Sequence, residues 1–233
     1  MTPIPPFIAC PLRPHIPVEL AALTERTRTR LSDADKKAGT RLLADAYCDL
    51  LDHCLIDLLR TIHQTHPSHT MDEALRMTEE VKEKIHHYLG WVAGFLSNER
   101  LVPVIAHFNG LVQEMELHGE RQHFTVFAIS PDLAANAMRV LATLHDGSAR
   151  HIDEGMELLI QAIEEGLEPL VLRPKQLMKF NFVVDKTLNG VITLVISLFK
   201  RSLRKLGPHL PRDLYPQVAL HLERFLVVST PKT

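Results

Sequence analysis

The sequence predicts an all-α fold, a single multi-helix, bundle-like domain of about seven to nine helices. Most stretches between the prolines carry the i, i+3, i+4 apolar spacing of amphipathic helices. The chain of 233 residues has only 10 glycines, which favours long helices over glycine-rich loops. Its 45% apolar residues are enough for a sizeable core. One alternative stays open, an α+β fold with a small sheet.

The domain division follows from the prolines. Residues 1–17 hold six of the 15 prolines and are expected to form an extended, proline-rich N-terminal arm. Residues 18–228 are expected to form one helical domain, and residues 229–233 a short tail. We find no internal repeat and no flexible linker inside the domain.

Local signals mark where several helices begin and end. Ser32 is suited to cap a long amphipathic helix that ends near Thr65. Thr70 and Glu73 match a capping box, and Ser130 precedes a proline at the first position of a later helix. The helices expected along the chain cover residues 18–31, about 33–65, 70–96, 103–117, 131–145, 149–167, 174–206 and 212–228.

Residues 123–129, with the sequence HFTVFAI, are the best strand candidate. They form a short run of β-branched and aromatic residues without helical spacing. A strand needs a partner, and the candidates are residues 170–172, 180–184 and 225–228. If one of them pairs, the fold becomes the α+β alternative.

A metal site is the first chemical hypothesis, because the chain has 14 histidines. Glu83 with His86, and Glu120 with His123, match the Glu-x-x-His spacing of di-metal sites in helical bundles. This composition gives about 1.7 such pairs by chance, so two pairs carry little information. Asp49 and His53 fall opposite the leucine stripe and are expected to face solvent. We therefore expect no metal and no other cofactor.

The sequence also lacks the local motifs of several enzyme classes. It has no G-x-S-x-G elbow, no phosphate loop of the G-x-x-x-x-G-K-[ST] type, no G-x-G-x-x-G and no H-E-x-x-H. A site built from scattered side chains would leave no such motif. The question of enzymatic activity stays open, and the sequence favours a non-enzymatic protein.

Charge is unevenly distributed although the net charge is only −2. Residues 153–168 contain six acids and no Lys or Arg, while residues 173–205 contain eight basic residues and only Asp185 against them. The two blocks can pair with each other or meet external partners. The near-neutral total and the absence of a helix-turn-helix pattern argue against a nucleic-acid partner.

The helix expected at 174–206 is apolar nearly all round before its basic end. Such a helix is buried in a domain, covered by a second subunit or laid against lipid. Whether it is core, interface or pocket wall therefore decides between functions. Its candidate interaction residues are Val191, Leu194, Val195, Leu198, Lys200, Arg201, Arg204 and Lys205.

These observations favour a non-enzymatic interaction or regulatory protein that self-associates through its apolar helices, as a homodimer or another homo-oligomer, with a protein partner as a further option. The first alternative is a helical protein that binds an apolar ligand or the membrane surface. The second is an enzyme with a carboxylate and histidine metal site. Three cysteines and no signal peptide favour a cytoplasmic location.

Overall fold

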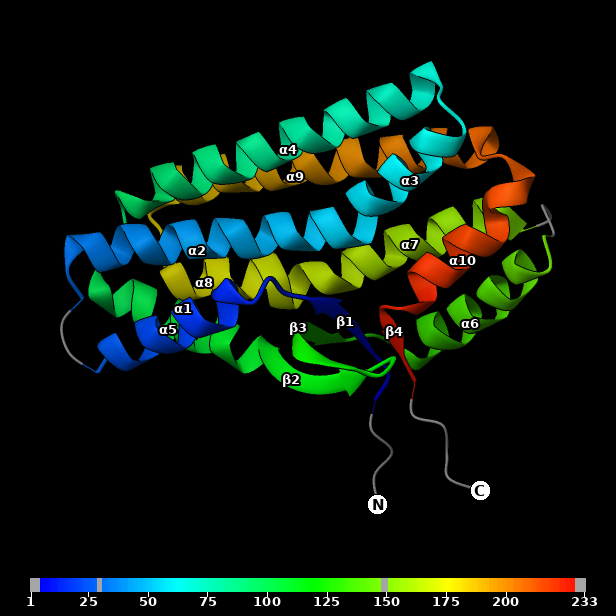
Figure 1. Ribbon diagram of the computed structural model, residues 1–233. Helices are drawn as coiled ribbons and strands as arrows, with labels where there is room; N and C mark the ends of the chain where they lie inside the picture. Colours follow the sequence, from blue (N-terminus) through cyan, green and yellow to red (C-terminus); the bar gives the residue numbers. More distant parts are fainter. Residues whose placement is uncertain (1–4, 29–30, 148–150, 229–233) are drawn as a thin grey trace.

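The computed structural model describes residues 5–28, 31–147 and 151–228. Helices dominate, and Figure 1 shows α4 and α9 as an outer layer over α2 and α7, with the sheet on the opposite side of the molecule. The prediction of a helical, multi-helix domain is confirmed, and the small sheet of the alternative is present as well. The division into arm, domain and tail stays a prediction, and residues 229–233 lie outside the described residues.

The first half of the chain is mostly helical. Its elements are β1 (Phe7–Pro11), α1 (His15–Arg26), α2 (Asp33–Leu51), the π-helix η1 (Asp52–Ile56), α3 (Asp57–Thr65), α4 (His69–Ala93) and α5 (Asn98–Leu111). Ser32 caps α2 in a capping box with Asp35, as its position predicts. The start of α4 differs from the prediction. Ser68 is the N-cap, and its hydroxyl accepts from the amide of Met71 at 3.3 Å.

The second half begins with a β-hairpin and returns to helices. Its elements are β2 (Val112–Leu117), β3 (Glu120–Ala128), α6 (Pro131–His145), α7 (Ile152–Leu167), the π-helix η3 (Glu168–Leu172), α8 (Arg173–Met178), α9 (Phe182–Leu206), the 3₁₀ turns η4 (Gly207–His209) and η5 (Arg212–Leu214), α10 (Tyr215–Glu223) and β4 (Leu226–Val227). Ser130 caps α6 as predicted, by accepting from the amide of Leu133.

The sheet has the order β2-β3-β1-β4, and every neighbouring pair is antiparallel. The helix predicted over 103–117 is wrong in its second half, where β2 pairs with β3. His118 and Gly119 both have positive φ, which is the backbone of a tight two-residue hairpin. Of the three predicted partners of the strand at 123–129, only the 225–228 segment joins the sheet. The arm contributes β1, whose residues pair with β3 from Phe7 to Pro11.

The helix predicted over 174–206 is interrupted. Lys179 has a φ of 47° and ends α8, and Asn181 then caps α9 by accepting from the amide of Val184 at 3.0 Å. A left-handed residue followed by a side-chain cap separates two helices more strongly than the apolar spacing joins them.

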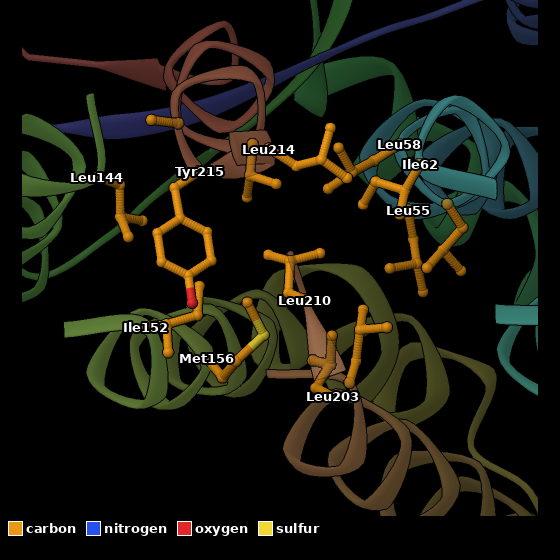
Figure 2. Packing of buried hydrophobic residues seen from close by; sticks show 14 of the residues in the cluster. Leu55, Leu58, Ile62, Leu144, Ile152, Met156, Leu203, Leu210, Leu214 and Tyr215 are labelled. Atoms are coloured by element: carbon orange, nitrogen blue, oxygen red, sulfur yellow. The ribbon is translucent and has the colours of Figure 1, made fainter. Parts of the chain in front are cut away.

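Two large apolar clusters hold the helices together. One lies between α3, α4, α6, α7, α9 and α10, and Figure 2 shows its side chains, among them Leu203 of α9 and Tyr215 of α10. The other lies at the end formed by α1, α2, α4 and α5, around Leu101 and Ile105. Between the clusters the packing is incomplete, and a cavity is left.

An internal cavity as the candidate functional site

A cavity of about 310 Å³ lies between the helices and the sheet and is partly open to solvent. Its wall takes residues from the sheet (Ile8, Phe127), from α2 and η1 (Leu50, Cys54), from α4 (Val81, Ile85), from α6 (Ala137, Leu141), from α7 (Leu159, Ala162) and from α9 (Val195, Phe199). Because so many elements contribute, no single stretch of sequence encodes it.

The wall is apolar almost everywhere. Among the residues that the structure describes, no charged residue lines it, and the polar side-chain atoms of its wall belong to Tyr47, Cys10 and Cys54. The Tyr47 hydroxyl donates to the backbone carbonyl of Leu170, so it is already satisfied. Burial raises the pKa of Tyr47, which keeps the phenol neutral. The cavity therefore offers hydrocarbon contacts and few hydrogen bonds.

The helix α9 forms one wall of this cavity. Val195, Ile196, Phe199 and Leu203 line it, while only 6% of the most apolar stretch of the helix is buried. The end of α9 belongs to the core through Leu203 and Leu206, whereas its middle lies in the wall of the cavity. By length and composition alone, residues 182–204 could also cross a membrane, with a mean hydropathy of 1.6.

The basic end of α9 is held by the acidic helix α7. The Lys200 amine donates a hydrogen bond to the carboxylate of Glu164. Arg204 donates two hydrogen bonds to the carboxylate of Glu157, one from Nε at 2.6 Å and one from Nη2 at 3.0 Å. The two charged blocks thus pair with each other, one of the two arrangements that the sequence allowed. These solvent-exposed ion pairs join α9 to α7 beside the cavity.

The other predicted interaction residues divide between the wall and the surface. Leu194 is 51% exposed and Arg201 is exposed, whereas Val191, Val195 and Leu198 are half-buried. The side chain of Lys205 lies outside the described part of the structure.

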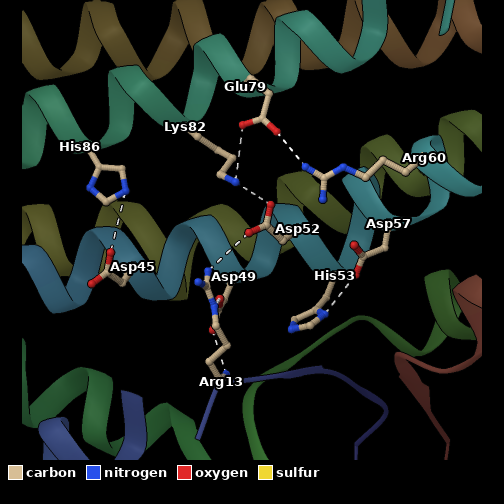
Figure 3. A network of polar contacts seen from close by, with 10 residues as sticks. All are labelled: Arg13, Asp45, Asp49, Asp52, His53, Asp57, Arg60, Glu79, Lys82 and His86. Carbon is tan, nitrogen blue, oxygen red and sulfur yellow. Dashed lines mark hydrogen bonds and ion pairs between the residues drawn. The ribbon is translucent and has the colours of Figure 1, made fainter. Parts of the chain in front are cut away.

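A polar network covers the outer side of the wall, between α4 and the α2–η1 segment (Figure 3). Lys82 of α4 donates to Asp52 at 2.7 Å and lies 3.6 Å from Glu79, which in turn binds Arg60 at 3.1 Å. Arg13, just before α1, contacts both Asp49 and Asp52. The network joins α4 to the α2–η1 segment, in which α2 carries Tyr47 and η1 carries Cys54.

Asp49 corrects one expectation from the sequence. It was expected to face solvent with His53, yet its side chain is fully buried, and it accepts from the backbone amide of Arg13 at 2.8 Å and from the Arg13 guanidinium. The segment before α1 lies across this face of α2 and covers it. His53 pairs instead with Asp57, at 3.3 Å.

The four candidate metal ligands do not form one group. Glu83 and His86 lie on α4, whereas Glu120 and His123 lie on the strand β3 rather than on a bundle helix. His86 is 3.9 Å from Asp45 of α2. Within the described ranges, no cluster of three or more His, Cys, Asp or Glu residues could hold a metal ion.

Comparison with protein-family models, with curated proteins and with solved structures finds no match to this chain. The cavity and its surroundings are therefore interpreted from their own chemistry.

Proposed function

We propose that this protein is a non-enzymatic binding protein for an apolar small molecule, held in the central cavity. One observation carries the proposal, a cavity of about 310 Å³ whose wall, in the described part of the chain, contains no charged side chain. Ligand sites typically begin at about 300 Å³, and a dry apolar cavity of about 150 Å³ holds benzene. The chemistry of the wall favours a hydrocarbon chain or fused aromatic rings.

The energetic cost of an empty cavity supports this proposal. At about 24 cal/mol per Å³, the cost measured for closed core cavities, a volume of about 310 Å³ sets an upper limit of about 7 kcal/mol for the lost packing, because this cavity is partly open to solvent. That figure is comparable to the whole stability of a typical domain, about 5 to 15 kcal/mol. An apolar ligand would recover part of it, whereas water finds few hydrogen-bond partners on this wall.

The cavity contains little that could catalyse a reaction. Tyr47 is engaged with a backbone carbonyl, and the other polar atoms belong to two thiols. General acid–base catalysis needs a titratable group near neutral pH that reaches the substrate. The site therefore supports binding rather than turnover.

The first test is a binding titration with the uncharged dye N-phenyl-1-naphthylamine. We expect saturable one-site fluorescence enhancement and competition by a medium-chain fatty acid. A ligand at one hundred times its Kd should add about 2.7 kcal/mol of stability and raise Tm by about 5 to 10 °C. Absence of saturable binding to natively folded protein would contradict the proposed function.

A second candidate function is attachment to a membrane surface, favoured by the end of the molecule where α4 stops and α9 starts (Figure 1). The rings of Trp91 and Phe95 meet edge to face there, with centroids 4.8 Å apart, and both residues are more than one-third exposed. Phe182 is 79% exposed, and the Lys186 amine lies 5.9 Å from its ring. Exposed aromatic residues beside cations are typical of interfacial anchors.

Liposome flotation tests this second function. We expect salt-sensitive binding to vesicles that contain anionic phosphatidylglycerol, and Phe182→Ser should weaken it about tenfold by removing buried apolar area. Leu220→Ser is the matched control, because Leu220 is 60% exposed on α10, away from this end. Equal losses in both variants, or no flotation at all, would remove the membrane function without affecting the cavity proposal.

Self-association through α9 stays a prediction. Among the interaction residues predicted from the sequence, the exposed Leu194 supports it, whereas Val195 faces the cavity and Lys200 and Arg204 are paired within the chain. Sedimentation velocity across a concentration series distinguishes a monomer from a dimer.

A further inference from the structure

Two of the three thiols face each other in the cavity wall. The sulfur atoms of Cys10 and Cys54 are 3.3 Å apart, although the residues are 44 positions apart in sequence. Both residues line the cavity, and no disulfide joins them in this structure. The third thiol, Cys48, is buried and does not line the cavity.

Two different elements hold these sulfur atoms in place. Cys10 lies on β1, next to Thr125 in the ladder with β3, and the neighbouring amide of Ala9 donates to the carbonyl of Phe225 at 2.8 Å. Cys54 lies in the π-helix η1, where the wider turn changes the direction of the side chains relative to a continuous α-helix. Such π-helical turns are frequent at functional sites. The thiol pair is thus set by the sheet on one side and by a helix irregularity on the other.

The two thiols differ in their exposure to solvent. The hydrogen bond with Cys54, together with burial, raises the pKa of Cys10. Cys10 therefore stays protonated and shielded from solvent, whereas Cys54 is only half-buried. Of the two thiols, Cys54 is therefore the one within reach of an oxidant in solution.

We propose that Cys10 and Cys54 form a reversible disulfide site in the cavity wall, oxidised by a low-molecular-weight disulfide such as oxidised glutathione. The Cys54 thiolate attacks one glutathione sulfur, the glutathione S–S bond breaks, and one glutathione leaves as a thiolate that takes up a proton. The Cys10 sulfur then loses its proton and attacks Cys54, which releases the second glutathione. Two protein thiols are oxidised, and one glutathione disulfide is reduced to two thiols.

The geometry requires only a small movement. A disulfide needs about 2.05 Å between its sulfur atoms, so the pair at 3.3 Å must approach by little more than one ångström. The bond would link the sheet covalently to the helical layer and close a long loop. A loop of this length restricts the unfolded chain, so Tm should rise by about 5 °C or more on oxidation.

The test treats the full-length protein with oxidised glutathione under native conditions and then alkylates it in denaturant. We expect the number of free thiols to fall from three to one, with a mass loss of two hydrogen atoms. Digestion should yield one cross-linked peptide pair containing Cys10 and Cys54, with Cys48 alkylated, and dithiothreitol should restore three thiols. Three free thiols after treatment, or a disulfide that includes Cys48, would overturn the proposal.

Single variants give a second readout that does not depend on the stability of the bond. Cys10→Ala should retain glutathione on Cys54, because no second thiol is present to release it, whereas Cys48→Ala should form the internal bond as the wild type does. A Cys10→Ala protein that takes up no glutathione, or a Cys48→Ala protein that forms no bond, would contradict the proposed order of attack or the proposed pair.

Discussion

Replacing Arg13 by methionine is expected to lower the free energy of unfolding by about 3 kcal/mol or more, because the fully buried Asp49 would lose its cationic partner. Methionine keeps most of the side-chain volume, so the loss reports charge rather than packing. The backbone amide of Arg13 still donates to Asp49 in this variant. The loss of stability should therefore be smaller than that caused by a buried carboxylate without any hydrogen-bond partner. Urea unfolding measures it, and a Tm decrease of about 6 to 12 °C should accompany it.

Two further variants identify the cause. Arg60→Met removes another arginine of the same network, whose pair with Glu79 is about half-exposed, and should cost no more than about 1 kcal/mol. The double variant Arg13→Met with Asp49→Leu removes both charges and should recover part of the stability lost in the single variant. If Arg13→Met and Arg60→Met lower the free energy of unfolding by equally small amounts, the Arg13 side chain does not stabilise the buried charge of Asp49.

Filling the cavity is expected to abolish apolar ligand binding while leaving the protein folded. The double variant Ala162→Phe with Val195→Trp adds aromatic side chains from α7 and α9, two helices that contact each other and share the cavity wall. We expect at least a tenfold loss of dye affinity, which corresponds to about 1.4 kcal/mol, together with an unchanged or higher Tm. The dye titration and a thermal melt measure the two quantities.

The matched control places the same side chains outside the cavity. Gln161→Phe with Leu194→Trp changes the preceding residue on each helix, and both of these positions are exposed. This variant should bind the dye as the wild type does. Equal binding by the cavity variant and the control would place the dye elsewhere, and a cavity variant that melts without cooperativity would be replaced by Val195→Trp alone.

Local signals in the sequence predicted most helices and several of their caps. Ser32 and Ser130 act within three residues of the backbone amides that they cap, so their roles are visible without a fold. The strand β2 was missed because VQEMEL has a helix-like composition. The hairpin signal at His118 and Gly119 differs from the common Asn-Gly turn, although Gly119, four residues before the expected strand, was a usable clue.

The functional features depend on contacts that the sequence does not display. Asp49 fell on the polar side of its helix, and only the position of Arg13, 36 residues earlier, explains its burial. The apolar side chains of α9 have the same spacing whether they meet a solid core or a void, so the pattern predicted apolar surroundings but not a cavity. Cys10 and Cys54 come together only when β1 enters the sheet and η1 changes the direction of its side chains.

The cavity also affects how much the volume of the protein changes on unfolding, and this change differs between the free protein and its complex with a ligand. A folded chain with imperfectly filled internal space occupies more volume than its atoms and hydration need, and unfolding eliminates that space. Hydrostatic pressure therefore favours the unfolded state of the free protein. A ligand that fills about 310 Å³ removes most of that volume difference, so occupancy of the cavity should determine how much pressure this fold withstands.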